Sequence, residues 1–150
     1  MKICSVFLLF VLIFSISFAN ANELSYVCKV KNAYKLNDDG SLVNENEEVL
    51  RLTIGSIFSV STDTGRITGK YVNTETATST HVLKKGSKTN SFRSIADWDF
   101  TGMATHAFQI LEIREFTNSK EKPFIVYASG GTGIKSGKCQ LALTDRQQYP

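Results

Sequence analysis

Apolar and polar residues alternate in short runs along most of the chain, and this pattern is what most constrains its fold. In a β-strand successive side chains point to opposite faces, so an alternating run buries one face and leaves the other in water. The clearest example spans 58–72, where Phe58 and Val60 alternate with serines and a turn at 62–65 precedes a second alternating run. This segment predicts a β-hairpin.

Similar runs recur to the end of the chain, separated by Gly, Asn and Asp. The run at 104–116 also fits a helical period, but Ile110, Ile113 and the strands around it favour a strand. Eight to ten short strands with polar turns are typical of a single antiparallel all-β domain, a barrel or a sandwich, over residues 22–150. Besides the hairpin, the expected strands are 26–34, 49–54, 80–83, 91–95, 104–116, 124–128 and 138–143.

Two of the three cysteines, Cys28 and Cys139, lie in the first and last expected strands. In an exported protein such a pair predicts a disulfide bond, with two free buried cysteines as the alternative. Both cysteines point with the apolar face of their run, and on the first run Tyr26, Val30 and Tyr34 share that face. A bridge would place the terminal strands side by side or across one core. Adjacent terminal strands would close a barrel, so a closed barrel is favoured over a sandwich.

The chain begins with a short basic start, an apolar stretch over 3–18, and the small-residue site at 19–21. This order is typical of a secretory signal peptide over residues 1–21, cleaved after Ala21. A membrane anchor is the alternative, but the apolar stretch is shorter than the ~20 residues that a spanning helix needs. We therefore expect the mature chain to be extracytoplasmic, either periplasmic or secreted, with no membrane anchor.

The composition and motifs point to no cofactor and to no nucleic-acid partner. The formal net charge of +3 is too small to indicate nucleic acid. The Gly-rich segment 129–138 resembles a phosphate-binding loop, but Thr132 occupies the position of the first Gly and Cys139 that of the Ser or Thr. The two histidines, His81 and His106, have no spacing that would predict a metal site.

The one remaining candidate for catalysis is Asp97-Trp98-Asp99, which holds the only tryptophan. Two acids beside an aromatic ring could grip a sugar or act as an acid and base. In a strand, however, the two acids share one face and Trp98 takes the other, which favours a core or rim tryptophan between solvated acids. We therefore find no catalytic constellation, and an enzyme is the least favoured class.

The Gly-rich segment is the stronger candidate for an interaction site. Its glycines would let the backbone approach a partner closely, and its cations suit an acidic cleft; a flexible hairpin connection is the alternative. The candidate partner-binding residues are Ser129, Gly130, Gly131, Gly133, Lys135 and Lys138.

Two functions follow from these expectations. The first is a protein-binding module, for example an inhibitor of an extracytoplasmic enzyme, acting through the Gly-rich basic loop. The alternative is a lipocalin-like carrier that binds a small molecule inside the barrel. The carrier predicts that Tyr26, Tyr71 and Tyr127 point inward and line a cavity.

Overall fold

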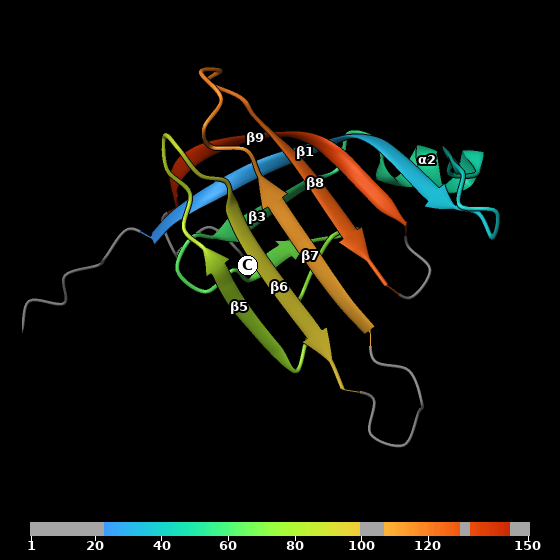
Figure 1. The fold of residues 1–150 in the computed structure, drawn as a ribbon, viewed down its shortest axis with the longest axis horizontal. Coiled ribbons are helices and arrows are strands. Elements are labelled where there is room, and N and C mark those ends of the chain that lie inside the picture. Colours follow the sequence, from blue (N-terminus) through green and yellow to red (C-terminus); the bar gives the residue numbers. More distant parts are fainter. Residues whose placement is uncertain (1–22, 100–106, 130–132, 145–150) are drawn as a thin grey trace, which may run out of the picture.

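Nine antiparallel strands form one sheet in the computed structural model, which describes residues 23–99, 107–129 and 133–144 (Figure 1). The strand order is β4-β3-β1-β9-β8-β7-β6-β5, and β2 pairs with β1 beside this path. This confirms the antiparallel β architecture. The strands are β1 (Glu23–Leu36), β2 (Leu42–Asn44), β3 (Ile57–Ser61), β4 (Ile67–Gly69), β5 (Ser79–Lys84), β6 (Phe92–Trp98), β7 (Ala107–Ile113), β8 (Lys122–Ala128) and β9 (Ile134–Thr144).

The sheet curls into a half-barrel whose two edges are β4 and β5 (Figure 1). Within the described ranges no backbone pairing joins these two strands, so the closed barrel is not confirmed. The edges nevertheless approach each other through packing. Gly65, in the turn before β4, lies so close to β5 and β6 that a Cβ atom there would be 2.7 Å from the Cβ of Ser94.

Cys28 and Cys139 form the predicted disulfide bond between β1 and β9. The two residues are direct partners in the antiparallel register, so the first and last strands lie side by side. They lie in the middle of the sheet rather than at its edges, and for this reason the bridge does not close a barrel. A disulfide bond is compatible with an extracytoplasmic location.

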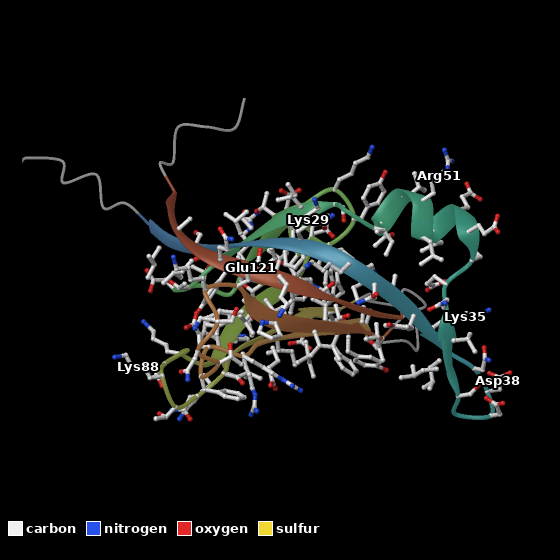
Figure 2. All side chains as sticks on the ribbon, turned by 90° about the horizontal axis from the view of Figure 1, so that it is seen from above. Lys29, Lys35, Asp38, Arg51, Lys88 and Glu121 are labelled. Carbon is white, nitrogen blue, oxygen red and sulfur yellow. A yellow bond between two sulfur atoms is a disulfide. The ribbon has the colours of Figure 1, made fainter. Side chains whose placement is uncertain are left out.

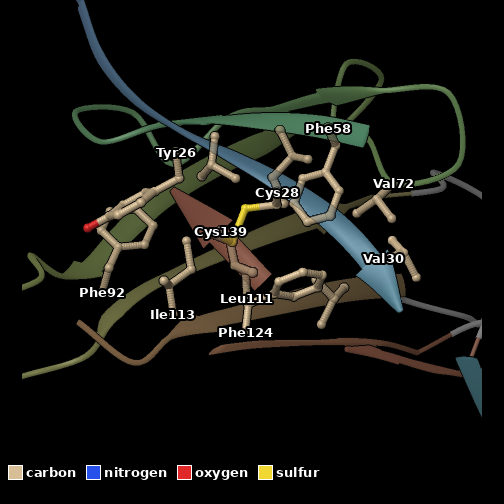
Figure 3. Packing of buried hydrophobic residues seen from close by; sticks show 13 residues of the cluster. Tyr26, Cys28, Val30, Phe58, Val72, Phe92, Leu111, Ile113, Phe124 and Cys139 are labelled. Atoms are coloured by element: carbon tan, nitrogen blue, oxygen red, sulfur yellow. A yellow bond between two sulfur atoms is a disulfide. The ribbon is translucent and has the colours of Figure 1, made fainter. Parts of the chain in front are cut away.

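The concave face of the half-barrel holds the apolar core, and the disulfide lies within it (Figure 3). Two aromatic pairs flank the bridge: Tyr26 with Phe92, and Phe58 with Phe124, each with ring centroids 5.2 Å apart. Aromatic pairs at this distance add to the stabilisation from apolar burial. The core is thus built around the contact between the terminal strands.

A bulge in β1 changes the face that its second half presents. The pairing with β9 shifts register between Val30 and Asn32. The next inward residue after Val30 is therefore Ala33, and both are 1% exposed. The prediction that Tyr34 shares the face of Val30 was wrong, because one extra residue reverses the alternation.

The expected strand at 49–54 is instead part of a helix, α2 (Glu47–Thr53). The side chain of Asn46 caps it by accepting a 2.9 Å hydrogen bond from the backbone N–H of Val49. Glu47 and Glu48 follow in the first turn, where negatively charged side chains interact favourably with the helix dipole and stabilise the helix. These local signals outweigh the alternation of leucine and isoleucine that had favoured a strand.

The other expected elements are found. β3 and β4 form the hairpin expected over 58–72, and the ambiguous run at 104–116 contains a strand, β7. Helix α2, with Arg51, and the β1–β2 hairpin, with Asp38, lie at one end of the molecule, while Lys88 lies at the other (Figure 2). No helix in the described part of the chain is both long and apolar enough to cross a membrane.

Candidate functional site

A lysine side chain is buried at the α2 end of the half-barrel. Lys135 is only 6% exposed. Sequence alternation placed this residue in a loop, but β9 already begins at Ile134. Lys135 therefore lies in the sheet, on the same face as Gly137 and Cys139, and points with them to the concave side. A buried cation in a core position is costly unless something compensates it.

A second polar side chain, Gln109, is buried nearby on the same face. It is 8% exposed and is the direct partner of Ala128 in the β7–β8 pairing. Among the described residues its Nε2 atom has no hydrogen-bond partner. Buried amide groups are almost always satisfied in folded proteins, so such an atom calls for an explanation.

Lys135 and Gln109 line the same open hollow, which has a volume of about 260 Å³. No carboxylate is among the described residues around it. The hollow combines an apolar floor with a few polar groups, which is the usual character of a small-molecule site. Its other principal lining residues are Lys70, Tyr71, Trp98 and Ser129.

Trp98 closes one side of this hollow from the end of β6. It follows Ala96 on the concave face, while Asp97 takes the opposite face, as the sequence had indicated. The indole Nε1–H donates a 3.1 Å hydrogen bond to Oγ1 of Thr76. This bond restrains the ring at the edge of the hollow.

A second open hollow of about 320 Å³ adjoins the first, since Tyr71 and Lys135 line both. Residues of α2 and of the segment before it form its other side, including Glu45 and Val49. Burial lowers the pKa of Lys135, and the negative charge of Glu45 acts in the opposite direction. The site is thus a pair of neighbouring hollows that share Tyr71 and Lys135 as lining residues.

A third hollow, of about 390 Å³, lies at the opposite end of the core between Tyr26 and Glu115. Here the charged side chains already have partners of opposite sign. Lys85 lies 3.4 Å from Asp63, and Lys122 lies 3.8 Å from Glu115. Oε1 of Glu115, which lines this hollow, is also buried without a hydrogen-bond partner among the described residues.

Among the predicted partner-binding residues that the structure describes, the two lysines lie on opposite faces of β9. Lys135 points to the concave side, whereas Lys138 lies on the opposite face of β9 and is half-buried. The hydroxyl of Ser129 accepts a 2.7 Å hydrogen bond from the backbone N–H of Phe108. Gly130 and Gly131 lie outside the described residues. The protein-binding role of this loop stays a prediction.

The described glycines of this segment allow close contact within the chain itself. Gly133 has a φ of 63°, and a Cβ atom there would lie 2.0 Å from the carbonyl oxygen of Tyr34. At Gly137 a Cβ atom would lie 2.0 Å from the carbonyl oxygen of Lys29. Glycine at these two positions lets β9 approach β1 across the bulge.

The remaining candidates are dispersed. Tyr26 is buried in the core and Tyr71 lines both hollows, but Tyr127 is 39% exposed, so the three tyrosines do not line one cavity. His81 is exposed on β5, and His106 lies outside the described residues. Sequence reasoning missed Gln109, although its place in an alternating run, on the face of Leu111, could have identified it as a polar residue in a core position.

Comparison of the chain with protein-family models, with curated proteins and with solved structures found no match.

Proposed function

We propose that this protein binds a small molecule in the hollow at the α2 end of its half-barrel. One observation carries the proposal. Two polar side chains, Lys135 and Gln109, are more than nine-tenths buried at inward positions that line an open hollow. Most other inward positions on the concave face hold the apolar core.

The amide of Gln109, whose Nε2 has no hydrogen-bond partner among the described residues, supports a ligand-binding role rather than a structural one. Leaving a buried amide without a partner costs about 1–3 kcal/mol, and an apolar side chain of similar shape avoids this cost. Nothing in the packing of β7 requires an amide, because its inward neighbours Leu111 and Ile113 are fully buried apolar residues. A ligand that accepts a hydrogen bond from Gln109 would recover the cost when it binds.

We further propose that this binding takes place outside the cytoplasm, in the periplasm or after secretion. The apolar N-terminal segment, interpreted as a signal peptide, and the disulfide bond both support this location. The function would then be that of an extracytoplasmic carrier or receptor for a small molecule. This is the carrier function expected as the alternative from the sequence, transferred from a closed barrel to a half-barrel.

Filling the hollow tests the proposal. The purified protein would be screened against a set of charged and neutral aromatic fragments by saturation-transfer NMR. We expect hits with the wild-type protein, and loss of these hits in Ala128→Phe, because Ala128 lines the hollow. The matched control is Ile125→Phe on the same strand, since Ile125 is 42% exposed and lies on the opposite face.

Three outcomes of the screen decide whether a small molecule binds in the hollow. Hits that are lost only in Ala128→Phe support the proposal, and hits that persist in Ala128→Phe place binding elsewhere and overturn it. The absence of hits with wild-type protein also overturns it. Should Ala128→Phe not fold, as judged by its NMR spectrum, Ala107→Leu narrows the same hollow with a smaller side chain.

A further inference from the structure

We propose that a second copy of this chain packs on the convex face of β6, β7 and β8, with the two copies related by a two-fold axis. This face is the opposite side of the sheet from the hollows, so the contact does not depend on a ligand bound there. Two features of the face support a dimer: an apolar row across the strands, and opposite charges on the two sides of that row.

The apolar row crosses the convex face at one level of the strand register. Its members are direct partners from β6 to β9: Ile95, Ile110, Tyr127 and Ile134. Each of them alternates with a buried residue on its own strand, so its side chain points outward. Tyr127 is 39% exposed and the three isoleucines are half-buried, so the row is open to solvent.

Two further apolar side chains widen this row over β7 and β8. Phe108 lies two residues before Ile110, and its ring centroid is 5.7 Å from that of Tyr127. Ile125 lies two residues before Tyr127 and is 42% exposed. We call these two residues and the row the outer patch. Apolar side chains gathered on one part of a protein surface are a common mark of contact with another molecule.

The charges beside the row are arranged for contact with an identical face. On β6, Arg93 and Asp97 lie two residues before and two residues after Ile95, and all three side chains point outward. A two-fold axis along the row reverses the direction of β6 in the second copy. Arg93 then lies opposite Asp97 of the partner subunit at both ends of the strand, which is the self-complementarity that a two-fold interface requires.

Both charged side chains are available for such a contact. Arg93 is exposed, and its Nε–H donates a 2.9 Å hydrogen bond to Oε2 of Glu112, which leaves the guanidinium with further N–H donors. The Asp97 carboxylate has no hydrogen bond or ion pair within the described ranges. Stacked sheets lie about 10 Å apart, a gap that an arginine and an aspartate side chain span together.

The surroundings of these two residues strengthen the case for a second copy. Lys84, the direct partner of Arg93 on β5, makes the Arg93 side of the row net positive despite Glu112. The other side holds Asp97. Acidic side chains beside the outer patch disfavour an anionic membrane surface as the occupant. An identical face presents both signs of charge at the matching positions.

Sedimentation velocity over a range of protein concentrations tests for the dimer. We expect the purified protein to be a monomer in dilute solution and a reversible dimer in concentrated solution. Tyr127→Lys introduces a charge into the row and should raise the dissociation constant of the dimer at least about tenfold. Ile57→Lys is the matched control, because Ile57 is 60% exposed on β3 and lies outside the outer patch.

Two charge-reversal variants test the two-fold axis itself. Arg93→Glu places two acids at each contact and Asp97→Lys places two cations there, so each variant alone should dimerise at least about tenfold more weakly than wild type. In an equimolar mixture, Arg93 of one chain meets Asp97 of the other, and the two substituted side chains meet each other. We therefore expect heterodimers in the mixture, detected by a fluorescent label on one variant. Should Arg93→Glu not fold beside Glu112, as judged by circular dichroism, Arg93→Ala should weaken the homodimer in part.

The outcomes separate a two-fold dimer from other uses of this face. Dimers that are weakened in Tyr127→Lys, kept in Ile57→Lys and recovered in the mixture support the proposal. A wild-type protein that stays monomeric up to about 1 mM overturns it. Dimers that persist in Tyr127→Lys place the contact elsewhere and also overturn it, and a mixture without heterodimers contradicts the two-fold axis. If the monomer instead binds phosphatidylglycerol vesicles through the outer patch, the face belongs to a membrane contact and the proposal fails.

Discussion

Cys28 and Cys139 face each other directly across β1 and β9, the two strands at the centre of the half-barrel. Both side chains are fully buried, between the Tyr26–Phe92 and Phe58–Phe124 ring pairs (Figure 3). The bridge therefore joins the two ends of the described chain in the middle of its core. The strands on either side, β3 and β8, depend on this central pair for their own pairing.

Removing the bridge should destabilise the fold strongly. The double variant Cys28→Ala/Cys139→Ala removes a covalent cross-link between residues that are 111 positions apart in the sequence. Loss of a native disulfide of this kind in a small domain typically lowers the free energy of unfolding by about 2–5 kcal/mol. Urea unfolding, followed by circular dichroism, measures the change. A loss below about 1 kcal/mol would contradict the central role of the bridge.

A side chain at position 137 should not be tolerated. Gly137→Ala places a Cβ atom 2.0 Å from the carbonyl oxygen of Lys29 and 2.8 Å from the ring of Phe124, so β9 must move away from β1. We expect a loss of about 2–3 kcal/mol in the free energy of unfolding, as for other overpacked core positions. Thermal and urea unfolding would be compared with Ser136→Ala, whose side chain lies on the opposite face. Equal stability of the two variants would contradict the close approach of these strands.

The sequence predicted much of this architecture, because most of its signals are local. Alternation located most of the strands, and the cysteines in the first and last of the expected strands predicted the bridge. The helix α2 was missed because a cap by Asn46 competes with a short apolar alternation, and neither signal is strong. The bulge after Val30 was missed because nothing in the local sequence marks the extra residue.

The candidate site was less predictable, because it is made by strands that are distant in the sequence. Lys135 looked like a loop cation beside glycines, yet those glycines serve the contact between β9 and β1. Gln109 can be recognised as a lining residue of the hollow only once its neighbours on the adjacent strands are known. The position of the hollow depends on the order of the strands in the sheet. The alternation pattern of the sequence does not reveal that order.

Stability at high pH should depend on Tyr26. Burial and, to a lesser degree, the negative charge of Glu115 raise the pKa of this phenol above its ordinary value of 10.0. The folded protein then keeps a proton that the unfolded chain releases, so the stabilisation is present below about pH 10 and is lost as the pH rises above it. Tyr26→Phe removes this dependence.

The measurement for Tyr26 is the free energy of unfolding in urea at pH 8 and pH 11. We expect wild-type protein to lose more stability between these values than Tyr26→Phe does. The lowered pKa of Lys135 acts with the opposite sign, but it is common to both proteins and cancels in the comparison. Equal losses in the two proteins would mean that the phenol of Tyr26 titrates normally.

In the ligand-free protein, Gln109 should lower the free energy of unfolding. Gln109→Leu removes a buried amide whose Nε2 has no partner among the described residues and replaces it with an apolar side chain of similar size. We expect the free energy of unfolding to rise by about 1–2 kcal/mol. Differential scanning calorimetry of the ligand-free proteins measures it. A clear loss of stability in Gln109→Leu would indicate a structural role for the amide and would weaken the case for a binding site.

The central claim is that a ligand occupies the hollow between Trp98, Gln109 and Lys135. The most direct test is a titration of ¹⁵N-labelled protein with the aromatic fragment of the screen that binds most tightly, followed by heteronuclear NMR. Because the chain has one tryptophan, its indole N–H gives a single signal from the edge of the hollow. The account predicts saturable shifts of this signal and of the Gln109 side-chain amide, with the backbone signals of Val27 and Ile125 on the convex face unchanged. Shifts confined to the convex face, or no saturable shift of the indole signal, would contradict it.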